Sequence, residues 1–282
     1  MLAAQEFHKS LNNNMKLLGN IMTIKLSAAV LATSFISSTA LAGIDVVPEP
    51  ATANNEQSSF KIGVGAAHSS KAYLGYDERQ SVIPLIEYNN PHIYVEGFEL
   101  GYKIIEDQQN RWSVFIGASS DEFDASKSRK LRAFDDRDMS AMLGTRYRHA
   151  NSWGVIDAKV AFDVSDKSDG SMASVSYGYP VQATDNWMIM PRGFVKMMDS
   201  DYANYYYGVS EEEARTIGAT AYQPGSAIKY GVELISTYQL NQDWQINAGA
   251  RLQMLDSDLR DSPMVSDDNE ATIFTGVTYR FW

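Results

Sequence analysis

The last quarter of the chain alternates between apolar and polar residues with a period of two. This is the pattern of β-strands, because successive side chains of a strand point to opposite faces of the sheet. One apolar wall recurs in three successive segments, and its residues are Ile228, Tyr230, Val232, Leu234, Tyr238 and Leu240, then Trp244, Ile246, Ala248, Ala250, Leu252 and Met254, and finally Ile273, Val277, Tyr279 and Phe281. We therefore expect three long strands joined by turns.

The alternation alone does not say whether the apolar wall meets a protein core or lipid. Length decides between them, since strands of about 11–13 residues exceed the usual 5–6 and match a tilted membrane crossing. The polar wall carries mid-strand charges at Lys229, Glu233, Arg251 and Arg280. We expect these charges to face a closed lumen, and the fold to be an all-β transmembrane antiparallel barrel.

The same pattern, followed back along the chain, predicts about twelve strands. Their ranges are 59–69, 81–88, 91–96, 98–105, 112–121, 139–149, 153–164, 171–182, 187–198, 227–240, 243–255 and 270–282. An even number places both termini on the periplasmic side, with short turns there and longer loops outside. Residues 81–105 are weakly separated and Pro84 indicates an edge or a bulge, so ten strands remains an alternative.

The N-terminal region has the pattern of an exported protein. Residues 22–42 combine Lys25, an apolar run and the small-residue site Ala40-Leu41-Ala42, which is typical of a cleaved signal peptide. We interpret residues 1–42 as an over-long start plus this signal, 43–58 as a periplasmic segment and 59–282 as an outer-membrane barrel. No 18-residue apolar run follows Ala42, so a transmembrane helix is not expected.

Composition argues against several functions. A net charge of −11 disfavours nucleic acid, and the absence of cysteine excludes thiol chemistry and Cys-based metal sites. His68 and Ser69 are neighbours on one strand and so point to opposite faces, which disfavours a lipase site. Acidic loop clusters lack the spacing of a calcium loop. We expect no enzyme activity, no metal and no cofactor.

Three features suggest local roles. The final strand places Val277, Tyr279 and Phe281 at alternate positions with Trp282 after them, which is typical of the signal that barrel-assembly machinery reads. In loop 199–226, Ser210 with glutamate three residues later predicts a capped helix that ends at Gly218. The basic run Lys127, Arg129, Lys130 and Arg132 could pair with lipopolysaccharide phosphates.

The C-terminal third contains Tyr207, Gly208, Val209 and Ser210, then Asp261, Ser262 and Pro263, and the final Tyr-Arg-Phe, after which Trp282 is an extra residue. In these residues the chain resembles the MipA/OmpV family. Weaker matches at 73–76, 84–85 and 136–138 extend the resemblance over most of the chain after residue 58.

The resemblance implies an outer-membrane barrel and, from one member, a scaffold that joins a lytic transglycosylase to a peptidoglycan synthase. The alternative is a narrow porin-like channel for small solutes. Contact with outer-membrane lipid and lipopolysaccharide is expected in either case.

Overall fold

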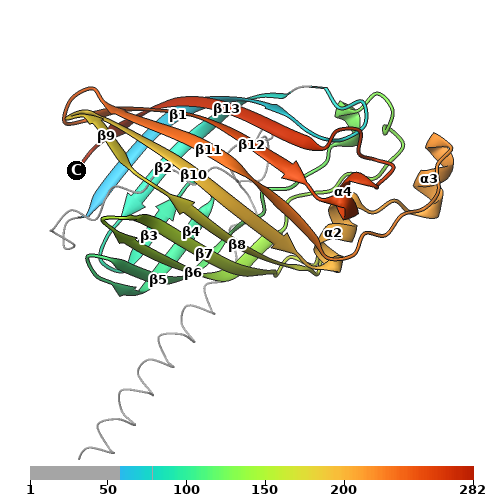
Figure 1. Ribbon diagram of the computed structural model, residues 1–282, viewed down its shortest axis with the longest axis horizontal. Coiled ribbons are helices and arrows are strands. Elements are labelled where there is room, and N and C mark those ends of the chain that lie inside the picture. Colours follow the sequence, from blue (N-terminus) through green and yellow to red (C-terminus); the bar gives the residue numbers. More distant parts are fainter. Residues whose placement is uncertain (1–57, 78) are drawn as a thin grey trace, which may run out of the picture. The chain divides into compact units, whose positions relative to one another are not determined.

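The strands of residues 58–77 and 79–282, the range that the computed structural model describes, form a closed antiparallel sheet (Figure 1). The interpretations of residues 1–42 and of nearly all of 43–58 fall outside this range and stay predictions. The strands are β1 (Ser59–Ser70), β2 (Arg79–Asn89), β3 (Ile93–Glu96), β4 (Glu99–Glu106), β5 (Asn110–Ala118), β6 (Ala141–Asn151), β7 (Gly154–Asp163), β8 (Ser171–Gly178), β9 (Val181–Thr184), β10 (Trp187–Met198), β11 (Ala227–Gln239), β12 (Trp244–Leu255) and β13 (Asn269–Arg280). The helices are η1 (Ala125–Lys127), α2 (Ser200–Tyr207), α3 (Glu211–Ile217) and α4 (Ser257–Arg260).

The barrel closes because the first strand pairs with the last. β1 and β13 are in register from Lys61 opposite Arg280 to Ser70 opposite Ala271. β8 and β9 follow one another and both pair with β10, so they act as one wall strand interrupted near Pro180. Over the described residues the barrel therefore has twelve wall strands, which confirms the prediction and removes the ten-strand alternative. The single strand predicted at 171–182 is corrected to two pieces.

The apolar wall faces outward. In β11, Val232 exposes 62% of its surface, whereas its neighbour Glu233 exposes 3%. The other apolar-wall residues of this strand, Tyr230 and Leu234, are also exposed. An apolar exterior around a charged interior is the inverse of a water-soluble sandwich and suits a wall that contacts lipid.

The two ends of the barrel differ. The short turns, the start of β1 and the end of β13 lie at one end of the barrel, where the C-terminus is seen in Figure 1. The helices α2, α3 and α4 lie at the other end. We call these the turn end and the loop end. Exposed aromatic side chains gather on the strand residues near the turns, and they include Trp112, Tyr147, Trp153, Tyr177, Trp187, Tyr238, Trp244 and Phe281. Such a row is typical of a membrane–water interface.

A charge placed in the outward wall should destabilise the barrel in a bilayer. We expect Val232→Arg to cost about 2–4 kcal/mol if the position lies near the bilayer midplane. Urea unfolding in phospholipid vesicles measures this loss. The control is Gln223→Arg, at an exposed position of the loop between α3 and β11, which should change the free energy of unfolding little. Equal stability of Val232→Arg and the control would show that this wall does not contact hydrocarbon.

Candidate functional site

The loop end of the barrel is filled by α2. Its first turn is held by Asp199, whose side chain accepts a hydrogen bond from the Tyr202 backbone N–H. The helix turns one face inward, and the buried residues on it are Tyr202, Ala203, Tyr206 and Tyr207. Sequence reasoning missed this helix because polar Asp, Asn and Ser interrupt its tyrosines and leave no clear helical period.

Aromatic and aliphatic side chains from other loops pack around α2. The Tyr73 ring stacks on that of Tyr207 with centroids 5.5 Å apart, and Phe123 meets Tyr73 edge-on at 4.9 Å. Leu131, Phe134, Leu259 and Met264 complete the cluster and are buried. We call this cluster the loop cap. It closes the loop end by the same apolar packing that forms the core of a soluble protein.

Two of the segments that carry the family resemblance, 207–210 and 261–263, lie at the loop end and are in contact with each other. The Ser262 hydroxyl donates to the Tyr207 carbonyl at 2.6 Å, and Val209 is bridged to Tyr222. Gly208 ends α2, Pro263 is half-buried and Asp261 is exposed. The two motif segments, 207–210 and 261–263, thus form one structural unit.

The capping prediction for α3 is confirmed. Ser210 and Glu213 form the reciprocal capping box, and Gly218 ends the helix in the left-handed region at φ 67°. Glu213 also accepts a hydrogen bond from Arg137 at 2.6 Å, so the helix is fixed to loop 119–140. The capping signal was local in the sequence, which is why it could be predicted.

A buried charge cluster lies directly beneath the cap. Asp121 accepts hydrogen bonds from Lys196 at 2.5 Å, from Lys229 at 2.6 Å and from the Tyr202 hydroxyl at 2.9 Å. Lys229 is also paired with Glu270 at 3.4 Å. Burial alone would raise the pKa of Asp121, but the ammonium groups of Lys196 and Lys229 outweigh burial and hold it well below its usual value.

Burial also raises the pKa values of the loop tyrosines. Desolvation raises the pKa of Tyr206 to about 12, and those of Tyr73, Tyr202 and Tyr207 are also raised well above their usual value by burial. Of these phenols, Tyr73, Tyr202 and Tyr206 donate hydrogen bonds, to the Tyr206 carbonyl, the Asp121 carboxylate and the Asp138 carbonyl respectively.

The four charges predicted for the lumen do not form one cluster. Lys229 joins the cluster under the cap, whereas Glu233 is buried against Arg192. Arg251 is half-buried with its guanidinium 4.0 Å from the Phe194 ring centroid, and Arg280 is half-buried at the turn end of β13. Asp121 and Arg192, the main partners, were missed because they are far from Lys229 and Glu233 in sequence.

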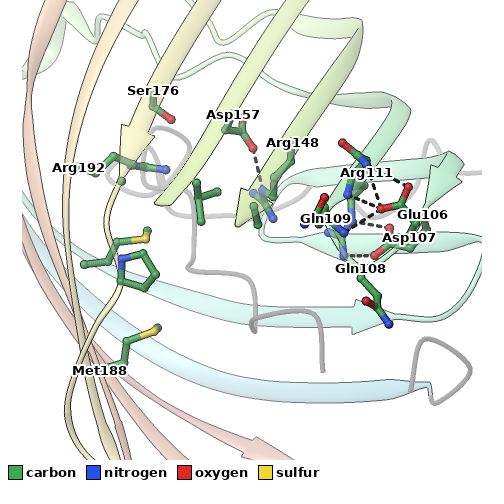
Figure 2. Close-up of a pocket in the computed structure, with 16 residues that line it drawn as sticks. Glu106, Asp107, Gln108, Gln109, Arg111, Arg148, Asp157, Ser176, Met188 and Arg192 are labelled. Atoms are coloured by element: carbon green, nitrogen blue, oxygen red, sulfur yellow. Dashed lines mark hydrogen bonds and ion pairs between the residues drawn. The ribbon is translucent and has the colours of Figure 1, made fainter. Parts of the chain in front are cut away.

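A pocket opens at the turn end (Figure 2). It encloses about 780 Å³ of space, including solvent at its mouth, between the turn 107–109 and the inner faces of β7, β8 and β10. Arg111 pairs with Glu106 at 2.7 Å, and Arg148 pairs with Asp157 at 3.0 Å. Arg192 lies on the opposite side of the pocket in Figure 2. The charges here are mostly balanced, so the pocket has no strong preference for one sign of ligand.

The comparisons with known proteins identify the family. The model of the family "MltA-interacting protein MipA" matches residues 62–281. The chain belongs to the MipA family. The MipA-type barrel is 32% identical to the putative outer membrane protein YiaT of Escherichia coli K12, over 82% of this chain and 95% of YiaT. It is 29% identical to the MltA-interacting protein of the same strain, over 80% of this chain and 91% of that protein.

An outer membrane channel from Pseudomonas putida F1 aligns over 82% of this chain and 99% of its own with a TM-score of 0.43 and 9% identity. The family and its outer-membrane relatives confirm the predicted resemblance and the outer-membrane location.

The residues of the predicted assembly signal close the MipA-type barrel at its turn end. The Phe281 and Trp282 rings lie 5.5 and 5.3 Å from that of Phe60, and Tyr279 meets Phe281 at 5.0 Å. Val277 is paired with Val64. Trp282 is not a loose extra residue, because its carbonyl accepts a hydrogen bond from Phe60.

Two further findings concern the described residues. No group of three or more His, Cys, Asp or Glu side chains within 58–77 and 79–282 is placed to hold a metal ion. None of the helices in this range is long and apolar enough to cross a membrane.

The basic run predicted to meet lipopolysaccharide is exposed at the loop end, where Arg129 pairs with Asp77.

Removal of the Asp121 charge should loosen the loop cap. Asp121→Asn leaves two buried ammonium groups without their shared anion, and breaking such a pair costs about 3–5 kcal/mol. We expect faster hydrogen exchange in residues 200–209, measured by mass spectrometry on the barrel in detergent. Asp135→Asn, an exposed position of the same loop, is the control.

The loosening of the loop cap by Asp121→Asn should become smaller at low pH. Because the folded pKa of Asp121 is lowered, its contribution is present above the unfolded carboxyl pKa of about 3.9 and is lost as the pH falls through the folded value. The difference between Asp121→Asn and the unsubstituted protein should therefore shrink below about pH 4. A difference that stays constant with pH would mean that the charge of Asp121 does not hold the cap.

Proposed function

We propose that this protein is a non-enzymatic anchor in the outer membrane that binds peptidoglycan-remodelling enzymes at its turn end. The name of one relative, MltA-interacting protein, supports a lytic transglycosylase as one partner. The family resemblance adds a peptidoglycan synthase as the second. In this proposal the barrel supplies position and a binding surface, and the chemistry belongs to its partners.

The observation that carries the proposal is the loop cap. Tyr202, Tyr206 and Tyr207 are almost wholly buried in the mouth of the barrel, and the charges beneath them are paired with one another. A twelve-strand barrel holds little beyond its own side chains compared with porins of 16–18 strands. A packed cap over an interior crossed by ion pairs favours a role at the surface over solute passage.

We place the partner at the turn end. The start of β1, the end of β13 and the short turns lie at this end. In bacterial barrels the end with the termini and the short turns is the periplasmic side. Peptidoglycan enzymes act in the periplasm, so this is the face that they would meet.

Charge reversal at the turn end should weaken capture of the partner. We expect the double variant Asp185→Lys with Asp243→Lys, both exposed turn positions, to lower affinity for a purified lytic transglycosylase about tenfold, or about 1.4 kcal/mol. Surface plasmon resonance on the detergent-solubilised barrel measures this affinity. The matched control reverses Asp135 and Asp267, exposed at the loop end.

The same preparation tests the channel alternative. We expect no discrete conductance steps in a planar bilayer from the unsubstituted barrel. Stepwise conductance together with no binding of the transglycosylase would replace the anchor by a narrow channel.

A further inference from the structure

The barrel wall is incomplete beside β2. β3 has only four residues, and its pairing with β2 ends at Glu87 opposite Glu96. The Ile86 carbonyl accepts one more hydrogen bond, from Gly97 at 3.2 Å, and β2 then continues to Arg79 without a neighbour on that side among the described residues. We call the space between residues 82–86 and the hairpin tip Gly97–Phe98 the wall gap.

The backbone of β2 is arranged for such an edge. Alternate residues of a strand direct their N–H and C=O groups to the same side. Since Ile86 directs its carbonyl to the β3 side, Pro84 and Val82 face the wall gap. Proline has no N–H to donate, which is why it occurs at edges. The edge that Pro84 predicted is therefore this one.

The wall gap lies at the level of the lipid-facing surface. Val64, Val82 and Ile86 point outward around it and are exposed, as is Ile116 on β5. Backbone groups left unsatisfied in hydrocarbon cost several kcal/mol each, so an open sheet edge at this level must be buried in protein or line a water-filled cavity. The groups of this edge therefore require water or another polar partner.

A cavity lies behind the wall gap. It encloses about 880 Å³ of space, including solvent at its opening, and its lining includes both outward-facing Pro84 and Ile86 and residues of the interior. It therefore passes through the plane of the wall. Its apolar side chains include Ile83, Leu85, Phe98, Phe115 and Met172.

The cavity also contains one charged cluster. Glu99 pairs with Lys159 at 2.9 Å and with Arg146 at 3.1 Å, and Glu96 pairs with Arg146 at 3.0 Å. Tyr94 donates to Glu99 at 2.6 Å. A ligand with a full charge would have to compete with these buried pairs. A neutral hydroxyl could hydrogen-bond at their margin without separating them.

We propose that the wall gap is a lateral binding site for a small apolar molecule that carries a neutral polar group and is dissolved in the membrane. The apolar body contacts Leu85, Phe98 and Phe115, and the polar group meets the cluster of Glu99, Arg146 and Lys159. The site is separate from the anchor role, so either can fail without the other.

Photo-labelling tests the site directly. The purified barrel in phospholipid nanodiscs is labelled with a long-chain alcohol that bears a diazirine, and the labelled residues are mapped by mass spectrometry. We expect saturable labelling at Ile83, Leu85 and Phe115. The unlabelled alcohol should compete about tenfold better than an alkane of equal length. Labelling confined to outward residues such as Val82 and Ile116, without saturation, would overturn the proposal, as would equal competition by the alkane.

A matched pair of variants tests the position of the opening. Leu85→Trp fills the cavity beside the wall gap and should lower saturable labelling at Ile83 and Phe115 about tenfold. Leu143→Trp makes the same change on the outward face of β6, where Leu143 is 50% exposed, and should leave labelling unchanged. Heat-dependent gel mobility verifies that both variants fold, and transglycosylase binding should be the same in both. Unchanged labelling in folded Leu85→Trp would overturn the proposal.

Discussion

The structure depends on one constraint, which is that a bilayer offers no hydrogen-bond partners to a backbone. The strands are therefore paired on both sides along most of the wall, with the wall gap beside β2 as the exception, and the sheet closes on itself. Closure is made by β1 and β13, which meet in register from Lys61 to Ser70. Gly63 allows this close approach, because a Cβ there would lie 2.0 Å from the Val277 carbonyl oxygen. Phe60, Phe281 and Trp282 then hold the closing strands together at the turn end.

Closure also forces the polar half of each strand inward. A twelve-strand barrel has little room, so the inward charges must neutralise one another at short range. They do so in separate groups. Asp121 binds Lys196 and Lys229 under the cap, Glu233 binds Arg192, and Asp157 joins Arg146 to Arg148 at 2.8 and 3.0 Å. The interior is thus a series of local ion pairs, and the loop cap adds an apolar layer above them.

Sequence periodicity predicted the wall well because that signal is local. Val232 and Glu233 are adjacent, and their opposite burial follows from the strand period alone. The helix after Ser210 was predictable for the same reason. The partners of the inward charges were not, since Asp121 lies 75 residues from Lys196 and 108 from Lys229. The break near Pro180 was also missed, because it depends on how β8 and β9 pair with β10.

The linings of the two cavities are linked by a buried ion-pair group. Arg146 lines the cavity behind the wall gap, Arg148 and Asp157 line the turn-end pocket, and Asp157 is bonded to both arginines. A molecule that passed between the cavities at this point would have to separate a carboxylate from two guanidinium groups, which is costly. A molecule in the wall gap therefore has its exit sideways into the membrane. A partner at the turn end meets a pocket whose inner wall is closed by charge, and for this reason binding at the two places can be independent within one small barrel.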